Sequence, residues 1–297
     1  MKILNFGSLN IDNVYAMEHF VRPGETVSSL SLQNFAGGKG LNQSVALACA
    51  GAKVYHAGAV GEDGEFLVEL LRSKGVNTDY IRRTEGKTGH AIIQVEQGGQ
   101  NCIILYGGSN QQITEQQVDE TLAHFEKGDI LLLQNEINGN GYIIDKAYEK
   151  GMKIAINPSP INEKITELHL EKVTYFIMNE IEGKELTGKE KPDDIIAEMK
   201  QRYPASQTVL TLGKAGAVAC DGKECCSHGI YQVKVVDTTA AGDTFTGFYL
   251  SSVADGLSMQ RALELASKAS SIAVGIKGAA NSIPTMQTVL EADLKLQ

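Results

Sequence analysis

The chain alternates short apolar runs with segments in which apolar residues recur every three or four positions. The short runs suit buried strands and cover Lys2–Phe6, Val54–Val60, Asp129–Leu133, Lys153–Ile156, Tyr175–Met178 and Thr208–Leu212. The periodic segments between them predict helices at Leu41–Ala50, Glu65–Lys74, Glu115–Phe125, Tyr142–Lys150 and Pro192–Tyr203. Alternating strands and helices are typical of a mostly parallel sheet with helices on both faces. The pattern therefore predicts an α/β fold of three layers.

One segment departs from this alternation. His90–Glu96 and Asn101–Tyr106 have the pattern of two strands, and Gln97-Gly98-Gly99-Gln100 between them suits the turn of a β-hairpin. The stretch from Asn13 to Asn34 also lacks helical periodicity. Two arrangements are open: a small sheet that projects from the main body, or an antiparallel edge of the central sheet. We prefer the first, a β-lid made from about residues 13–34 and 88–108.

No low-complexity linker, charge run or fixed-period repeat divides the 297 residues, so we expect a single domain over residues 1–297. No stretch approaches the roughly 20 apolar residues of a membrane span. The N-terminal residues 1–8 turn polar too early for a signal peptide. These features predict a cytoplasmic protein that is not embedded in a membrane.

Charge and cysteine content narrow the class of partner. The formal net charge of -9 argues against nucleic acid, because a phosphate backbone is normally met by a surplus of Lys and Arg. The five cysteines are Cys49, Cys102, Cys220, Cys225 and Cys226. Their number is odd, and the adjacent pair Cys225-Cys226 suits neither a disulfide framework nor a zinc site. We expect reduced thiols.

The strongest local signal for chemistry runs from Asp237 to Phe248 and leads into an apolar helical stretch through Val253. Its small residues, Ala240, Ala241 and Gly242, would leave the free amides of a first helical turn open to an anion. Asp243 follows them. On local grounds a helix cap is the commoner use of such an Asp. The alternative is a general base that accepts the proton of a hydroxyl attacking a phosphoryl group.

A second glycine cluster, Gly37-Gly38-Lys39-Gly40, also precedes a predicted helix. It lacks the spacing of a Walker loop, and no Gly-x-Gly-x-x-Gly follows a strand, so classical dinucleotide binding is not supported. Asn10 and Asp12 lie two apart beyond the first predicted strand and would project the same way. Such a pair suits the hydroxyls of a polyol, although an Asx-type turn is equally compatible with it.

Together these segments resemble the ribokinase family of carbohydrate kinases, the pfkB type, over essentially the whole chain. Residues 37–43 are similar to the family's Gly-Gly-Lys-Gly-x-Asn-Gln, in the form found in ribokinases rather than fructokinases. Residues 237–247 resemble its C-terminal signature almost without change. Further matches lie at Asn135-Glu136, Asn157-Pro158-Ser159-Pro160, Asn179-Glu180-Ile181-Glu182 and residues 211–216.

The resemblance implies an ATP-dependent phosphotransferase that acts on a primary hydroxyl of a small sugar, with D-ribose as the preferred acceptor. A nucleoside, 2-deoxyribose or hexose kinase of the same family is the alternative, followed by a non-catalytic sugar-binding regulator. Asp243 would be the base, and the amides of Ala240, Ala241 and Gly242 the anion hole. The residues implied to hold the sugar are Asn10, Asp12, Gly38, Lys39, Asn42, Glu136 and Asp243.

The same resemblance implies sites for ATP, Mg²⁺ and K⁺. The positions matching nucleotide contacts are Asn179, Thr211, Gly213, Gly216, Gly242 and Ser267. Glu182 would act on Mg²⁺ through water. The monovalent-cation loop would comprise Asp237, Thr239, Ala273, Ile276, Gly278 and Ser282. The β-lid would close over the sugar and build a homodimer interface.

Three positions depart from the usual pattern of ribokinases. Ser267 stands where a His or Asn is frequent near the adenine, Thr239 replaces a frequent Ile, and Tyr106 ends the lid where a smaller or imidazole side chain is common. None of these removes a catalytic group. They leave the preferred sugar open, because lid side chains select which acceptor fits.

Overall fold

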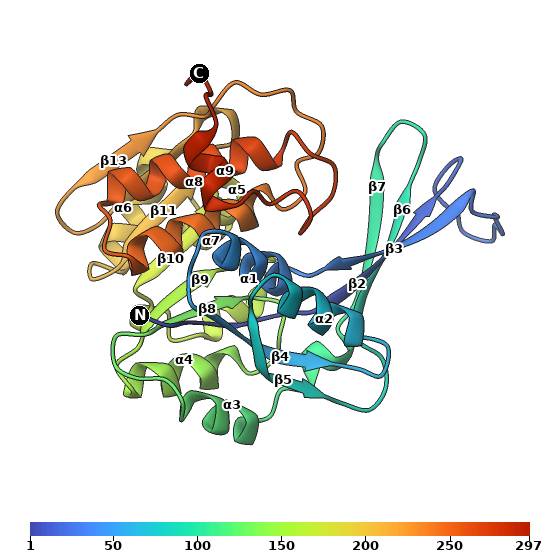
Figure 1. Ribbon diagram of the computed structural model, residues 1–297, viewed down its shortest axis with the longest axis horizontal. Coiled ribbons are helices and arrows are strands. Elements are labelled where there is room, and N and C mark those ends of the chain that lie inside the picture. Colours follow the sequence, from blue (N-terminus) through green and yellow to red (C-terminus); the bar gives the residue numbers. More distant parts are fainter.

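A nine-stranded sheet forms the centre of the computed structural model, which describes residues 1–297 apart from the side chain of Lys164 (Figure 1). Its order is β13-β12-β11-β10-β9-β8-β1-β4-β5. The strands are β1 (Ile3–Phe6), β4 (Val54–Val60), β5 (Asn77–Arg83), β8 (Ile130–Gln134), β9 (Lys153–Asn157), β10 (Tyr175–Asn179), β11 (Gln207–Thr211), β12 (Ala217–Cys220) and β13 (Cys225–His228). All neighbours pair in parallel except β11 with β12 and β12 with β13.

Helices cover both faces of this sheet. They are α1 (Lys39–Cys49), α2 (Glu65–Ser73), α3 (Glu115–Leu122), α4 (Asn140–Glu149), α5 (Glu180–Thr187), α6 (Pro192–Arg202), α7 (Ala241–Ala254), α8 (Met259–Ala273) and α9 (Met286–Glu291). Short 3₁₀ turns occur at η1 (Gly108–Gln111), η2 (Glu163–Glu167), η3 (Leu170–Lys172) and η4 (Gly213–Ala215).

The core divides into two apolar clusters, one on each face of the sheet. Ile3 of β1 packs with α1, α2, α7, α8 and α9 on one side, whereas its neighbour Leu4 packs with α3, α4, α5 and α6 on the other. Successive side chains of a strand point to opposite faces, so each strand contributes to both clusters. The predicted three-layer α/β fold is confirmed. No helix in the part of the chain that the structure describes is long and apolar enough to cross a membrane.

A separate four-stranded sheet projects from one end of the body (Figure 1). Its order is β3-β2-β6-β7, from β2 (Asn10–Ala16), β3 (Ser31–Gly37), β6 (Gly89–Val95) and β7 (Asn101–Tyr106). The preferred expectation of a small projecting sheet is confirmed. The alternative, an antiparallel edge of the central sheet, is wrong because none of these strands pairs with the nine-stranded sheet.

The expectation of five reduced thiols is wrong for two of them. Cys220 and Cys225 face each other in register at the turn between β12 and β13, with their Cα atoms 4.1 Å apart, and they form a disulfide. Sequence spacing alone does not indicate this hairpin, because the pairing depends on the register of β12 with β13. Cys49, Cys102 and Cys226 are free thiols.

Helices α1 and α7 pack closely enough to place their N-termini side by side. A Cβ atom added at Gly247 of α7 would lie 2.4 Å from the Ala46 Cβ atom and 2.7 Å from the Leu47 backbone nitrogen, both in α1. Such distances are well inside van der Waals contact, so only glycine permits this approach. The two glycine-rich segments singled out in the sequence therefore begin their helices at a common point.

Candidate active site

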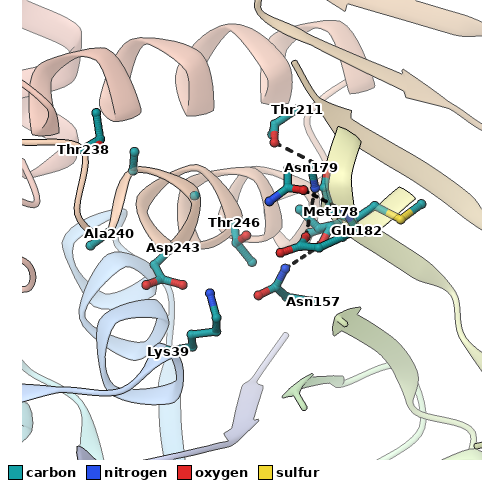
Figure 2. Close-up of a pocket in the computed structure, with 13 residues that line it drawn as sticks. Lys39, Asn157, Met178, Asn179, Glu182, Thr211, Thr238, Ala240, Asp243 and Thr246 are labelled. Atoms are coloured by element: carbon teal, nitrogen blue, oxygen red, sulfur yellow. Dashed lines mark hydrogen bonds between the residues drawn. The ribbon is translucent and has the colours of Figure 1, made fainter. Parts of the chain in front are cut away.

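A cavity of about 220 Å³ lies where α1, α7 and the carboxyl end of β10 meet (Figure 2). Its lining comes from segments far apart in the chain and comprises Lys39, Asn157, Ile177, Met178, Asn179, Glu182, Thr211, Thr238, Ala240, Ala241, Gly242, Asp243 and Thr246. We call it the central pocket. Ligand sites of open α/β sheets form outside the carboxyl ends of their strands, and this pocket has that position.

Asp243 is the third residue of α7 and is 6% exposed. The residue at the N-cap is Ala240, with a left-handed φ of 59°, and no side chain caps this helix. The capping role preferred on local grounds for Asp243 is therefore wrong. Its carboxylate instead accepts hydrogen bonds from α1, with Oδ2 3.1 Å from Asn42 Nδ2 and Oδ1 2.8 Å from Gln43 Nε2.

The start of α7 offers amides to the central pocket. Thr244 Oγ1 donates to the Ala240 carbonyl at 2.8 Å, and Ser270 Oγ donates to the Ala241 carbonyl at 3.0 Å, so the turn is held from both sides. The Ala241 amide donates to the Thr238 carbonyl at 3.3 Å. The amides of Gly242 and Asp243 have no partner within the helix, as in any first turn, and they carry the positive end of the helix dipole.

Lys39 brings a positive charge to the same place. Figure 2 shows Lys39 on α1 beside Asp243 on α7. Burial alone would lower the pKa of the Lys39 ammonium. The three carboxylates around it, those of Asp243, Glu136 and Glu182, together outweigh burial and raise that pKa. A lysine that stays charged beside free helix amides favours an anionic group in this pocket.

A second group of polar residues lies next to Lys39, where the lid joins the body. Glu136 Oε2 accepts hydrogen bonds from the Lys39 amide at 3.0 Å and from the Ser8 hydroxyl. Asn10 is buried, and its Oδ1 accepts a hydrogen bond of 2.7 Å from Asn110 Nδ2. Asp12 lies two residues beyond Asn10 on β2 and therefore points to the same side of the strand.

Two carboxyl groups in this cluster have unusual acidity. Burial raises the pKa of Asp12 to about 6, and the nearby Glu136 carboxylate adds to the increase. Burial also raises the pKa of Glu136, while the hydrogen bond from Ser8 and the charge of Lys39 only partly oppose it. Asp12 fits only because residue 37 is glycine, since a Cβ atom there would lie 2.1 Å from Asp12 Oδ2. Crowded acceptors of this kind suit a ligand with several hydroxyl groups.

A larger groove of about 530 Å³ adjoins the central pocket and shares Thr211, Thr238, Ala241 and Gly242 with it. Of the predicted nucleotide positions, Thr211, Gly213, Gly216, Gly242 and Ser267 line this groove. Its remaining lining is mostly apolar and includes Ile230, Tyr231, Val233, Val235, Phe245 and Val274. A flat, partly apolar ligand with an anionic end would occupy the groove with that end in the central pocket.

Asn179 and Glu182 line the central pocket rather than this groove. They form a capping box at the start of α5, in which Asn179 Oδ1 accepts from the amides of Ile181 and Glu182, both at 2.9 Å. Glu182 Oε2 in turn accepts from the Asn179 amide at 3.0 Å. The capping box holds the Glu182 carboxylate at the pocket wall.

The predicted cation loop is brought together from two segments. Asp237 Oδ1 accepts from the Thr239 amide at 2.9 Å and from its hydroxyl at 2.6 Å, and Oδ2 accepts from the Gly278 amide at 2.9 Å. Burial on its own would raise the pKa of Asp237. The hydrogen bonds from Thr239 and Gly278 and the charge of Lys277 outweigh burial, so the pKa of Asp237 lies below its usual value. Ser282 Oγ donates to the Ala279 carbonyl, and the Ile276 amide to the Ala273 carbonyl.

Across the described residues, no group of three or more His, Cys, Asp or Glu side chains could hold a metal ion.

Several residues of the site were missed in the sequence. Gln43 and Asn157 lie inside segments quoted for their motifs, and Ser8 lies two residues before Asn10, so proximity to these positions was the available signal. Asn110 and Gln134 lie in a 3₁₀ turn and a buried strand without any motif. Only the folded structure shows that they contact the polar cluster.

Comparison with known proteins agrees with this geometry. The sequence profile described as pfkB family carbohydrate kinase matches residues 1–286. A ribokinase from Haemophilus influenzae is 35% identical over 295 residues, which cover 96% of each chain. Among solved structures, Arabidopsis thaliana ribokinase complexed with ribose and ATP has a TM-score of 0.88 and 30% identity, with 98% of this chain and 97% of that chain covered. Cryptococcus neoformans ribokinase in complex with ADP has a TM-score of 0.86, 33% identity and coverage of 98% and 99%.

The raised pKa of Asp12 predicts a pH-dependent cost to folding. Between the ordinary value of 3.8 and the folded-state value of about 6, the folded protein binds more protons than the unfolded chain, so stability falls as pH rises through this window. Asp12→Asn should therefore be more stable than the wild type above pH 6, by on the order of 1–3 kcal/mol, and this advantage should vanish below pH 4. Urea unfolding between pH 4 and pH 8 measures it.

The matched control is Glu69→Gln on the exposed side of α2, which should change stability by less than about 0.5 kcal/mol at every pH. A stability difference for Asp12→Asn that is constant from pH 4 to pH 8 would contradict the assigned pKa.

Proposed function

The chain belongs to the pfkB family of carbohydrate kinases, and we propose that it transfers the γ-phosphoryl group of MgATP to the 5-hydroxyl of D-ribose. The observation that carries this proposal is the position of Asp243. It lies between a cluster of hydroxyl-binding side chains on one side and the free amides of α7 on the other. Ribose in the cluster and a nucleotide in the groove would both reach this carboxylate.

In the proposed reaction, Asp243 accepts the proton of the sugar hydroxyl as the hydroxyl oxygen forms its bond to the γ-phosphorus. The bond between that phosphorus and the oxygen bridging to the β-phosphate breaks, and ADP leaves with its electron pair. The amides at the start of α7 and the Lys39 ammonium hold the moving phosphoryl group. Alignment and stabilisation of charge account for most catalysis of phosphoryl transfer.

We assign the sugar to Asn10, Asp12, Gly38, Lys39, Asn42 and Glu136, together with Asp243, which are the residues that the sequence resemblance implies. Four of these form one contiguous surface, because the Lys39 amide donates to Glu136 and a Cβ atom at the adjoining Gly38 would approach the Asn10 amide to 3.1 Å. The buried partners Ser8 and Asn110 orient the carboxylate and the amide before any sugar arrives. Such preorganisation reduces the entropy lost on binding.

Two cations complete the proposal. The Glu182 carboxylate lines the central pocket, and carboxylate oxygens suit Mg²⁺ and its bound waters. Mg²⁺ when bound neutralises phosphate charge during transfer. The loop of Asp237 and Thr239 faces the segment that contains Gly278, and it precedes the amides of α7 by only a few residues. K⁺ held by this loop, with Ala273, Ile276 and Ser282, would order those amides without touching the sugar.

The lid supplies a surface for a second copy of this chain. All six residues of β7 are exposed, and four successive side chains from Ile103 to Tyr106 are apolar or aromatic and 51–60% exposed. Since neighbours along a strand point to opposite faces, both faces of this edge strand carry apolar surface. If the lid closed over the sugar site of its own subunit, it would cover only one of the two faces of β7. We therefore propose a homodimer formed through the lids.

The location follows from the proposed reaction, since MgATP and K⁺ are abundant in the cytoplasm. We propose that the enzyme works there, on a small sugar and ATP rather than on nucleic acid or a membrane. Structural disulfides are rare in that compartment, so we propose that the Cys220–Cys225 disulfide of the structure is reduced there to two thiols that the β12–β13 hairpin keeps close together.

The acceptor is tested by a panel of ribose, 2-deoxyribose, fructose and inosine, with ADP release coupled to a detection system and with K⁺ replaced by Na⁺ in parallel. Ribose should have the highest kcat/KM. K⁺ should raise kcat with a smaller effect on the KM for sugar, because the loop of Asp237 and Thr239 immediately precedes the amides of α7 and contains none of the residues assigned to the sugar. Turnover of a hexose or a nucleoside without any pentose would refute the ribose assignment. Sugar binding without any ADP release would favour a non-catalytic regulator.

The base is tested by Asp243→Asn, which keeps the shape of the side chain and removes its proton-accepting charge. We expect kcat to fall about 10²–10⁴-fold, in line with the usual contribution of a general base. Sugar affinity measured by calorimetry should change little. Asp255→Asn, at the opposite end of α7, is the matched control and should keep wild-type kcat. A near-wild-type kcat for Asp243→Asn would show that another group accepts the proton.

The dimer is tested by Ile104→Asp, which places a charge on the exposed surface of β7. Sedimentation velocity should show a dimer for the wild type and a monomer for this variant, because a buried unpaired carboxylate at an interface is strongly unfavourable. Leu290→Asp is the control, since Leu290 is 56% exposed on α9, outside the lid. A wild-type monomer at micromolar concentration, or a dimer that survives Ile104→Asp, contradicts the proposed interface.

A further inference from the structure

Gln43 joins Asp243 to a series of buried, hydrogen-bonded side chains that line neither pocket. We call this series the chain of side chains. Gln43 is completely buried in α1 and lines neither the central pocket nor the adjoining groove. Its Nε2 atom lies 2.8 Å from Asp243 Oδ1 and 3.2 Å from Asn157 Oδ1. An amide nitrogen has two protons, so both are used on these two oxygens. Gln43 therefore contacts the proposed base and the pocket wall without being able to contact a ligand.

The orientation of the Gln43 amide is set by a second glutamine. Gln134, at the end of β8 and also completely buried, donates from Nε2 to Gln43 Oε1 at 2.6 Å. The same Nε2 atom donates to Asn5 Oδ1 at 2.9 Å, on the neighbouring strand β1. Gln134 thus meets two acceptors with its two protons, as Gln43 does.

The chain ends at a neutral histidine. Asn5 Nδ2 donates to the Ser44 hydroxyl at 2.8 Å, so the proton of that hydroxyl is free to point at His56 Nδ1, also 2.8 Å away. Nδ1 must then be the acceptor, and Nε2 carries the proton toward the Gly7 carbonyl at 3.2 Å. Burial lowers the pKa of His56 to about 4, although the hydrogen bond to Gly7 opposes this. The histidine therefore keeps one tautomer at neutral pH.

Every amide in this chain has only one favourable orientation. A half-turn of the Gln43 amide would direct Oε1 at the Asp243 carboxylate and at Asn157 Oδ1, and would set its nitrogen against Gln134 Nε2. Two acceptors or two donors facing each other in a buried site lose their hydrogen bonds and keep the full cost of desolvation. Asn157 cannot relieve the conflict by turning, because its own Nδ2 donates to the Ile177 carbonyl at 2.9 Å.

We infer that Gln43 is a positioning residue for the transfer reaction, and that Gln134 and Asn5 hold it in the single orientation that donates to Asp243. This inference rests on the proposed function, in which Asp243 is the base. The other donor to that carboxylate, Asn42, belongs to the proposed sugar site, and its own Oδ1 is buried without a hydrogen-bond partner, so its contacts would change when sugar binds. Gln43 is the donor that stays the same before and after binding, and it keeps Oδ2 directed at the acceptor hydroxyl.

The test compares Gln43→Met, Gln134→Met and the double variant with the wild type, because methionine keeps length and volume but donates no hydrogen bond. With the best sugar of the panel, Gln43→Met should lower kcat roughly 10- to 100-fold, as small misplacements of a reacting group do. The KM values for sugar and ATP should stay within about threefold, since neither side chain touches a ligand. Gln134→Met should lower kcat less, and the double variant should be no slower than Gln43→Met alone.

The matched control is Gln117→Met on α3. Gln117 is 3% exposed and donates to the Gly58 carbonyl at 2.8 Å, so it loses the same kind of buried hydrogen bond but has no connection to Asp243. This variant should lose stability and keep wild-type kcat. The inference is wrong if Gln117→Met is as slow as Gln43→Met, if Gln43→Met keeps wild-type kcat, or if the two glutamine effects multiply in the double variant.

Urea unfolding of the wild type, Gln43→Met, Gln134→Met and the double variant separates this inference from the proposed function. A direct hydrogen bond between the two glutamines should make their effects on the free energy of unfolding non-additive. If the wild type phosphorylates no sugar, the proposed function fails, and the unfolding data still decide whether the chain of side chains exists. Additive losses of stability would overturn the chain of hydrogen bonds even in an active kinase.

Discussion

The close contact between α1 and α7 determines most of what the site can do. Gly247 allows the two helices to touch at backbone distance, and this brings the free amides of α7 next to the start of α1. The contact also lets Asn42 and Gln43 of α1 reach the Asp243 carboxylate on α7. A carboxylate beside a helix N-terminus would otherwise fold back and cap it. Here the hydrogen bonds from Asn42 and Gln43 already fix the orientation of the Asp243 carboxylate, and one edge of that carboxylate remains for a substrate.

This arrangement carries a cost that the rest of the fold offsets. Lys39, Asp243, Glu136 and Asp12 lie together in a partly buried space, and burial, reinforced by the charge of a neighbouring carboxylate, raises the pKa values of Asp12 and Glu136. Buried charges of this kind destabilise a fold unless they are paired and hydrogen-bonded. Two apolar clusters, one on each face of a nine-stranded sheet, supply the compensating stability. Functional sites commonly break local rules in this way.

Local sequence patterns were sufficient for the layers of the fold but not for the geometry within them. The apolar runs at β1, β4, β8, β9, β10 and β11 stood out because fully buried strands are short and continuous. The strands β5, β12 and β13 were missed, since β5 is half exposed and polar and the other two are four residues long. The motifs indicated which residues belong to the site. They could not show Gln134 or Asn110, whose contacts join positions about 90 to 100 residues apart and leave no local signature.

Asn110 shows why such long-range contacts matter for the lid. It lies in η1, the 3₁₀ turn after β7 by which the lid strand returns to the body. Its Oδ1 accepts from the Leu9 amide at 3.0 Å, and its Nδ2 donates to Asn10 Oδ1 at 2.7 Å. Residue 89 must be glycine here, because a Cβ atom would lie 2.1 Å from Asn110 Nδ2. The turn that joins the lid to the body and a side chain proposed to bind the sugar are thus one hydrogen-bonded unit, so a movement of β7 at this turn would change the donors and acceptors of the proposed sugar site.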